Sequence, residues 1–238
     1  MTPLLLLPGL VCDRAIWAPV LAALEAEAAC TVADYGASAS LPAMAARVLA
    51  GAPPRFALAG HSMGGRVALE IMRMVPQRVQ RLALLDTGYQ ARAAGAAGAS
   101  ERAARVALLD LARRAGMRAM GLQWLTGMLA PSRLTDAGLV EAIADMVARH
   151  SSEVFGAQIE ALLHRPEATD VLRAITCPTL IACGRQDAWS PFARHADMAR
   201  LVDGATLVAF EDCGHMAPME RPQAVAAALV DWLRQPAA

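Results

Sequence analysis

Short apolar runs recur along the chain, separated by longer segments in which apolar residues return with helical spacing. Each run is continuous rather than alternating, which is typical of strands that other elements cover on both faces. We therefore expect a mostly parallel sheet with helices on each side. The six runs that predict strands lie at residues 4–8, 30–34, 55–59, 81–86, 179–183 and 206–210.

Helical segments lie between most of these strands. The clearest is residues 41–50, which has Ser40 and Pro42 at its start and Gly51 after its end, as is usual at helix termini. Another, residues 67–74, is stopped by Pro76. Further helices are predicted at residues 16–28, 192–201 and 223–234. Strand and helix thus alternate, which indicates an α/β fold.

The segment between Thr87 and Pro178 has a helical composition and few strand signals. Glycine and proline interrupt it at Gly95, Gly98, Gly116, Gly127, Pro131 and Pro166. Its most apolar stretch contains Met117, Met120, Leu122, Trp124, Leu125, Met128 and Leu129. These side chains either pack the segment against itself, as methionines at helical spacing usually do, or line a pocket for an acyl chain or a ring.

The sequence Gly60-His61-Ser62-Met63-Gly64 follows the predicted strand at 55–59 and precedes a predicted helix. A serine at such a strand-to-helix turn has a strained backbone that exposes its hydroxyl, and the flanking glycines let the turn close. Ser62 is therefore the candidate nucleophile. Its neighbour His61 is expected to be a packing or loop residue.

Two further predicted strands are followed, after a short turn, by residues that would activate a serine. The strand at 179–183 runs through Gly184 to Asp187, and the strand at 206–210 runs through Gly214 to His215. Nucleophile, acid and base then follow in the order Ser, Asp, His, which is the order of the α/β-hydrolases. Asp86, at the end of the strand at 81–86, is the alternative acid, and we favour Asp187.

With these residues in place, the chain resembles the α/β-hydrolase fold superfamily over essentially its whole length. The resemblance implies Ser62, Asp187 and His215 as catalytic residues, and a sheet with spatial order 2-1-3-4-5-6 where the full family sheet has eight strands. It also implies a core of residues 1–87 and 176–238, with a helical cap, or lid, of residues 88–175 inserted before the last two strands.

The opening segment Leu4–Leu10 resembles the family's first oxyanion loop, with Pro8 where a histidine is usual. The backbone N–H groups of Leu10 and Met63 are accordingly the candidate oxyanion donors. Arg66, near the start of the helix after the turn, is the candidate for substrate choice, and Trp124 is a further candidate pocket residue. Arginines of the segment at 88–175, Arg105 among them, are expected mostly on a solvated face, as are His150, His164 and His195.

Composition narrows the function classes. Twenty-two basic and 22 acidic residues give no net charge, which disfavours nucleic-acid and anionic-membrane partners. The five cysteines lack paired CxxC spacing, so we expect free thiols in a cytoplasmic protein, with neither disulfides nor a metal site. We expect no cofactor and a small-molecule substrate, and apolar surface on the helical segment could support a homodimer.

The leading hypothesis is a serine hydrolase that cleaves a small carboxylic ester, thioester or lactone through an acyl-enzyme. Small carboxylesterases and enol-lactonases look most similar. The alternative is a carbon-carbon lyase or hydrolase that uses the triad as a base. It is suggested by Gly64-Gly65-Arg66, which resembles the menaquinone-pathway synthase of this fold. A third reading, from another class, is a binding protein on the same scaffold.

Overall fold

The computed structural model describes residues 1–236 and contains one six-stranded sheet. Its spatial order is β2-β1-β3-β4-β5-β6 and every neighbouring pair is parallel, so the order predicted for the sheet is confirmed. The strands are β1 (Thr2–Leu7), β2 (Ala28–Val32), β3 (Phe56–His61), β4 (Val79–Leu85), β5 (Thr179–Gly184) and β6 (Thr206–Phe210).

The strands in the middle of the sheet are buried on both faces because helices pack on each side. Every residue of β3 and β5 is buried, whereas the edge strands β2 and β6 are mostly half-buried or exposed. The continuous apolar runs of the sequence have this cause. The carboxyl ends of the parallel strands therefore meet along one edge of the sheet, where the candidate residues follow β3, β4, β5 and β6.

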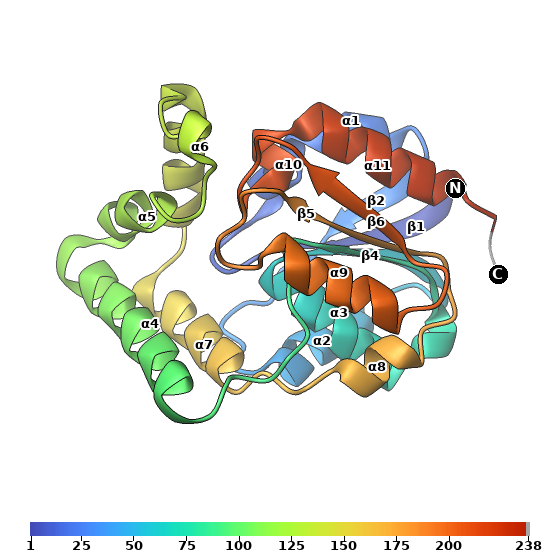
Figure 1. Cartoon of the computed structure of the whole chain (residues 1–238), viewed down its shortest axis with the longest axis horizontal. Coiled ribbons are helices and arrows are strands. Elements are labelled where there is room, and N and C mark those ends of the chain that lie inside the picture. The colour runs from blue at the N-terminus through green and yellow to red at the C-terminus, as the bar shows by residue number, and fades with distance from the viewer. Residues whose placement is uncertain (237–238) are drawn as a thin grey trace.

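Helices cover both faces of the sheet (Figure 1). One face carries α1 (Ala18–Glu25) and α11 (Pro222–Arg234), and the other carries α2 (Leu41–Ala50), α3 (Met63–Met74) and α9 (Phe192–Leu201). The Ser40 side chain caps α2 by accepting a hydrogen bond from the Ala43 amide, as its sequence predicted. The short α10 (Ala217–Glu220) follows β6.

Five helices lie between β4 and β5, as the sequence indicated. They are α4 (Gly95–Ala115), α5 (Met117–Leu125), α6 (Ala137–Ala148), α7 (Ser152–Leu163) and α8 (Thr169–Arg173). Helices α4 to α7 pack on one another at one end of the sheet (Figure 1), whereas α8 packs against α3 and α9. Below, "the cap helices" means α4 to α7. The expected break at Gly98 is absent, because this glycine lies inside α4.

Short 3₁₀ turns, η1 (Arg14–Ile16), η2 (Pro76–Arg78) and η3 (Pro131–Arg133), complete the described structure. Of the helices in residues 1–236, none combines the length and the apolarity needed to cross a membrane.

Candidate active site

Ser62 stands at a strained turn between β3 and α3. Its φ of 54° and ψ of −116° lie in a region that non-glycine residues rarely adopt. The turn is held from β4, because the Ser62 amide donates to the Leu85 carbonyl at 2.9 Å and the Thr87 hydroxyl donates to the Ser62 carbonyl at 2.7 Å. A Cβ on Gly64 would stand 2.1 Å from the Leu7 carbonyl oxygen, so only glycine fits there.

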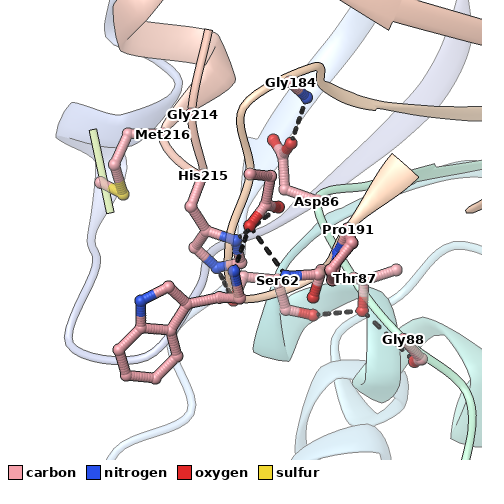
Figure 2. Close-up of polar contacts among 12 residues, drawn as sticks. Ser62, Asp86, Thr87, Gly88, Gly184, Pro191, Gly214, His215 and Met216 are labelled. Atoms are coloured by element: carbon pink, nitrogen blue, oxygen red, sulfur yellow. Dashed lines mark hydrogen bonds and ion pairs between the residues drawn. The ribbon is translucent and has the colours of Figure 1, made fainter. Parts of the chain in front are cut away.

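Three polar side chains are linked by hydrogen bonds at this end of the sheet. Ser62 Oγ lies 2.8 Å from Nε2 of His215, and Nδ1 of His215 lies 2.8 Å from Oδ2 of Asp187. Figure 2 shows the ring of His215 pointing toward Ser62. Nδ1 of His215 donates to the Asp187 carboxylate, which leaves Nε2 free to accept the serine proton. The structure thus brings together the three residues that the sequence predicted as nucleophile, acid and base.

Asp187 is fixed as an ionised partner of His215. Its Oδ1 accepts the backbone N–H groups of Trp189 and Ser190, both at 2.8 Å. Burial alone would raise the pKa of Asp187, but His215 and the backbone donor at Ser190 outweigh it, and the pKa lies below its usual value. The charge remains available to orient the imidazole and to stabilise its protonated form.

Asp86, the alternative acid, points elsewhere. Its Oδ1 accepts the Gly184 amide at 2.9 Å (Figure 2), and its Oδ2 lies 3.7 Å from Nε2 of His61. Complete burial and the nearby charge of Asp187 raise the pKa of Asp86 well above its usual value. Of the two candidate carboxylates, only Asp187 contacts the His215 ring.

The two residues that carry the candidate oxyanion donors lie at the cavity beside Ser62. Leu10 and Met63 both line this cavity with Ser62 and His215. Met63 is the first residue of α3, where a backbone N–H has no partner inside the helix. Both amides therefore remain candidates as donors to a negatively charged oxygen on a substrate.

The loop that carries Leu10 is braced without the histidine usual at position 8. Gln158 of α7 accepts the Val11 amide through Oε1 at 2.8 Å, and the Tyr35 hydroxyl donates to the Pro8 carbonyl at 3.1 Å. Both side chains are buried. Nothing in the sequence indicates this brace, because Gln158 lies 147 residues from Val11 on a cap helix.

The loop that carries His215 is held by the segment after α5 and by Glu220. The His215 amide donates to the Met128 carbonyl at 2.6 Å. The buried Glu220 carboxylate accepts three backbone N–H groups at 2.9 Å, from Ala130, Gly214 and Met216. Glu220 therefore ties the two residues that flank His215 to the cap side of the molecule, a role that sequence reasoning missed.

The cavity beside Ser62 has a volume of about 250 Å³. Trp124 of α5 lines it and packs against Trp189, with ring centroids 5.8 Å apart. The other members of the Met117–Leu129 stretch named above do not line it. Except for Leu122, these are buried, which favours the packing interpretation of that stretch.

Arginines line the same cavity in larger number than the sequence predicted. Arg66 points into it as anticipated, joined by Arg105, Arg165 and Arg194 and by one acidic residue, Glu101. Arg105 was expected on a solvated face, but only 14% of its side chain is exposed. Arg165 and Arg194 were missed, because each lies outside the serine motif and approaches the cavity only in the folded chain.

His195 is buried rather than solvated, contrary to the sequence prediction. Its Nε2 accepts the Thr87 amide at 3.0 Å, so Nδ1 carries the proton and faces the Pro191 carbonyl at 3.3 Å. Burial lowers the pKa of His195 to about 4. His61 is also buried, as a packing residue should be, and its Nε2 donates to the His215 carbonyl at 2.7 Å.

Within the described part of the chain, no cluster of three or more His, Cys, Asp or Glu side chains is arranged to hold a metal ion. The polar groups at the strand ends are instead organised around Ser62.

Among curated proteins, the chain is similar to a hydrolase. The chain is 28% identical over 181 residues to the 2-hydroxy-6-oxononadienedioate/2-hydroxy-6-oxononatrienedioate hydrolase of Escherichia coli K12. The match covers 75% of this chain but spans only 62% of the relative's length.

Solved structures match over nearly the whole chain. A thermophilic esterase from Thermogutta terrifontis, with malate bound, is 28% identical with a TM-score of 0.86, covering 98% of this chain and 90% of that one. The enol-lactonase from Burkholderia xenovorans LB400 is 22% identical with a TM-score of 0.86, covering 99% and 92%. MenH from S. aureus is 19% identical with a TM-score of 0.85, covering 98% and 93%. The last two likenesses show the fold alone.

The family model described as "Alpha/beta hydrolase family" matches residues 4–228. The match includes every strand of the sheet except the first residues of β1, the serine turn, the cap helices and the loop of His215. The sheet order and the position of Ser62 after β3 agree with it. The chain therefore belongs to the alpha/beta hydrolase family.

Proposed function

We propose that this protein is a serine hydrolase that cleaves a small carboxylic ester, thioester or lactone. The observation that carries the proposal is the unbroken hydrogen-bonded series from Ser62 through His215 to Asp187, at the wall of a cavity. A neutral serine hydroxyl is a weak nucleophile, so it needs a base at hydrogen-bond distance. Nε2 of His215 meets that requirement at 2.8 Å.

In the proposed mechanism, Ser62 Oγ attacks the substrate carbonyl carbon while its proton passes to Nε2 of His215. The carbonyl oxygen becomes an oxyanion, which accepts hydrogen bonds from the amides of Leu10 and Met63. Collapse of this intermediate expels the alcohol or thiol, which takes the proton from His215 and leaves an ester of Ser62. A water molecule, deprotonated by His215, then attacks that ester and releases the acid.

Relatives of known chemistry support this assignment. The esterase from Thermogutta terrifontis is 28% identical and matches along nearly the whole chain. Sequence identity of this order does not fix the substrate, because part of the cavity wall comes from the cap helices, and members of one fold act on different substrates. The ester, thioester or lactone is therefore assigned from the site and not from any one relative.

The test is turnover of p-nitrophenyl esters of increasing acyl length by wild type and Ser62→Ala. Wild type should release p-nitrophenol and form a transient acyl adduct, visible as added mass on the intact protein. Ser62→Ala should lose roughly a thousandfold or more in kcat and form no adduct. Because the cavity is small, short acyl chains should give the highest kcat/KM. A folded wild type without turnover or adduct would overturn the proposal, and would favour a binding protein or carbon-carbon chemistry.

One observation favours the second candidate, a carbon-carbon lyase or hydrolase that uses the same residues as a base. That chemistry would need a pocket for a carboxylate, and arginines gather around Arg66. The Escherichia coli relative is a hydrolase of 2-hydroxy-6-oxononadienedioate, a dicarboxylate. Incubation with a 2-hydroxy-6-oxo-dienoate separates the candidates: cleavage of this compound, with p-nitrophenyl esters left intact, would favour the second.

A further inference from the structure

The cavity beside Ser62 carries an excess of positive charge. Four of its lining residues are arginines and one is a glutamate: Arg66, Arg105, Arg165, Arg194 and Glu101. The Glu101 carboxylate pairs with Arg105 at 3.1 Å and with Arg165 at 2.6 Å. In residues 1–236, no carboxylate lies within 4.0 Å of the guanidinium of Arg66 or Arg194. The lining thus contains two guanidinium groups without a counter-charge.

Each of these two groups makes a single hydrogen bond to the described protein. Arg66 Nη1 donates to the Gln90 carbonyl at 2.9 Å, and Arg194 Nη1 donates to the Trp189 carbonyl at 3.2 Å. A guanidinium has five N–H donors in a fork that matches a carboxylate. Donors on both groups are therefore left for a ligand in the cavity.

The two guanidinium groups approach the same small space because residue 88 has no side chain. A Cβ on Gly88 would stand 2.8 Å from Arg66 Nη2 and 3.5 Å from Arg194 Nη1. The two positive guanidinium groups near Gly88 repel each other. An anion bound between or beside them would offset that repulsion. The arrangement is thus incomplete without a negative charge.

The electrostatic environment of Arg66 agrees with this geometry. Burial, together with the charges of Arg165 and Arg194, lowers the pKa of Arg66 to about 9. The protein therefore holds the Arg66 cation at a cost, which a bound carboxylate would offset through charge-assisted hydrogen bonds.

We propose that Arg66 and Arg194 form an anion-binding subsite, and that the substrate carries a carboxylate a few bonds from the carbonyl that Ser62 attacks. This inference rests on the proposed function. Arg66 follows Ser62 by four residues on α3, about one helical turn, so both side chains rise from the same end of the helix. The cavity has a volume of about 250 Å³, which suits a small substrate such as a half-ester of a short dicarboxylic acid.

The test compares matched esters that differ by one carboxylate. p-Nitrophenyl hydrogen glutarate carries a carboxylate on its acyl chain, and p-nitrophenyl valerate is its neutral counterpart. 4-Carboxyphenyl butyrate and phenyl butyrate form a second pair, with the charge on the alcohol side. We expect wild type to prefer the charged member of at least one pair in kcat/KM, by roughly 10- to 100-fold, as for a hydrogen bond to a charged group.

Variants assign that preference to the subsite. Arg66→Met and Arg194→Met should each abolish most of the preference, because kcat/KM should fall further for the charged ester than for its neutral counterpart. Arg66→Lys keeps the positive charge and should retain part of the preference for the charged ester. The matched control is Arg200→Met on α9, where Arg200 is exposed and paired with Asp197, and it should retain the full preference.

The outcomes separate this inference from the proposed function. Cleavage of neutral esters without a preference for either charged one, or a preference that survives in Arg66→Met and Arg194→Met, would overturn the subsite alone. If no ester is cleaved, calorimetric titration of Ser62→Ala with glutarate and with its neutral diamide still tests it. Glutarate should then bind roughly tenfold tighter than the diamide, and Arg66→Met in that background should remove the difference. Equal binding of the two would overturn the subsite.

Discussion

Gln158 is a buried side chain of the cap helix α7, and it contacts the loop that carries the candidate oxyanion donor Leu10. Its Oε1 accepts the Val11 amide, one residue beyond the candidate oxyanion donor Leu10. Val11 has a φ of 46°, an unfavourable conformation for a β-branched residue, so the loop needs a partner to hold it. The position of the Leu10 amide thus depends on an amide side chain from α7.

We predict that Gln158→Leu lowers kcat for a p-nitrophenyl ester by roughly tenfold or more. Complete loss of an oxyanion donor costs about 10²- to 10³-fold, and a displaced donor should cost less. KM should change little, because Gln158 is not among the cavity-lining residues around Ser62. Steady-state kinetics check this, with the exposed Gln123→Leu as the control. An unchanged kcat in folded Gln158→Leu would mean that the brace does not position the donor.

At this scale, local sequence predicted the residues that follow strand ends and part of the cavity lining, but not the side chains that brace the loops. Ser62, Asp187 and His215 were identifiable because each follows an apolar run within a few residues, and the carboxyl ends of parallel strands share one edge. Gln158, Glu220 and Arg194 were not, because each acts on a partner far away in the chain or in a cavity that exists only after folding. The buried His195 was mistaken for a solvated residue because charged and polar residues surround it in the sequence.

Among the elements, the loop between β6 and α10 is held by a buried carboxylate. Glu220 on α10 accepts the amides of Gly214 and Met216 on either side of His215, and that of Ala130 from the cap side. A Cβ on Gly214 would stand 2.3 Å from the Met128 carbonyl oxygen, so the loop and the segment after α5 are in direct backbone contact. Glu220 is a positioning residue in this account, since it contacts the backbone beside His215 and not the cavity.

We predict that Glu220→Gln lowers both kcat and stability. A glutamine keeps one carbonyl oxygen, but its NH₂ group would face an N–H that the carboxylate now accepts. The free energy of unfolding should fall by about 2 to 4 kcal/mol, because hydrogen bonds to charge are lost and a buried N–H is left unpaired. Urea unfolding and ester kinetics check both effects.

The matched control for Glu220→Gln is Glu25→Gln, because Glu25 is exposed and paired with Arg14. A Glu220→Gln protein with lower stability but unchanged kcat would show that the carboxylate supports the fold without positioning His215.

Elements were more predictable than the site. The six strands and their order followed from apolar runs and from the family resemblance, and the cap on α2 followed from Ser40. Helix boundaries in the cap were less predictable, since Gly98 lies inside α4 whereas Gly116, with a φ of 88°, does separate α4 from α5. A glycine interrupts a helix only where the chain uses its conformational freedom, and the sequence alone does not show where that is.

Across the whole molecule, the cap helices and the core are joined next to the candidate catalytic residues. Gln158 on α7 holds the loop of Leu10, and the segment after α5 holds the loop of His215. These contacts tie both sides of the cavity to the cap, so unfolding of the cap and loss of activity should occur together. Oligomeric state remains a separate question, and the homodimer suggested by the sequence stays a prediction.

Global stability should depend on two buried histidines. Burial lowers the pKa of His195 to about 4 and that of His61 to about 3, so both are neutral in the folded protein. In the unfolded chain a histidine titrates near 6.5, so below this pH the unfolded state binds more protons. Stability is therefore full above about pH 6.5 and falls with decreasing pH, by up to about 1.4 kcal/mol per pH unit for each histidine.

We predict that His195→Gln lowers the slope of the free energy of unfolding against pH by the contribution of one histidine. The variant should also be less stable than wild type at pH 7. Urea unfolding at pH 7, 6 and 5 measures the slope for both proteins. The control is His164→Gln, because His164 is exposed, and it should keep the wild-type slope. Equal slopes in wild type and His195→Gln would contradict a neutral, buried His195.

The central claim is that Ser62 is the nucleophile, and covalent labelling with a fluorophosphonate tests it most directly. Wild type should gain the mass of one phosphonyl group, located on Ser62 by peptide mapping. Ser62→Ala should gain none while its circular dichroism and unfolding midpoint stay close to wild type. The control Ser100→Ala, altered at an exposed serine of α4, should label fully. Labelling that persists in Ser62→Ala, or no labelling of folded wild type, would contradict the account.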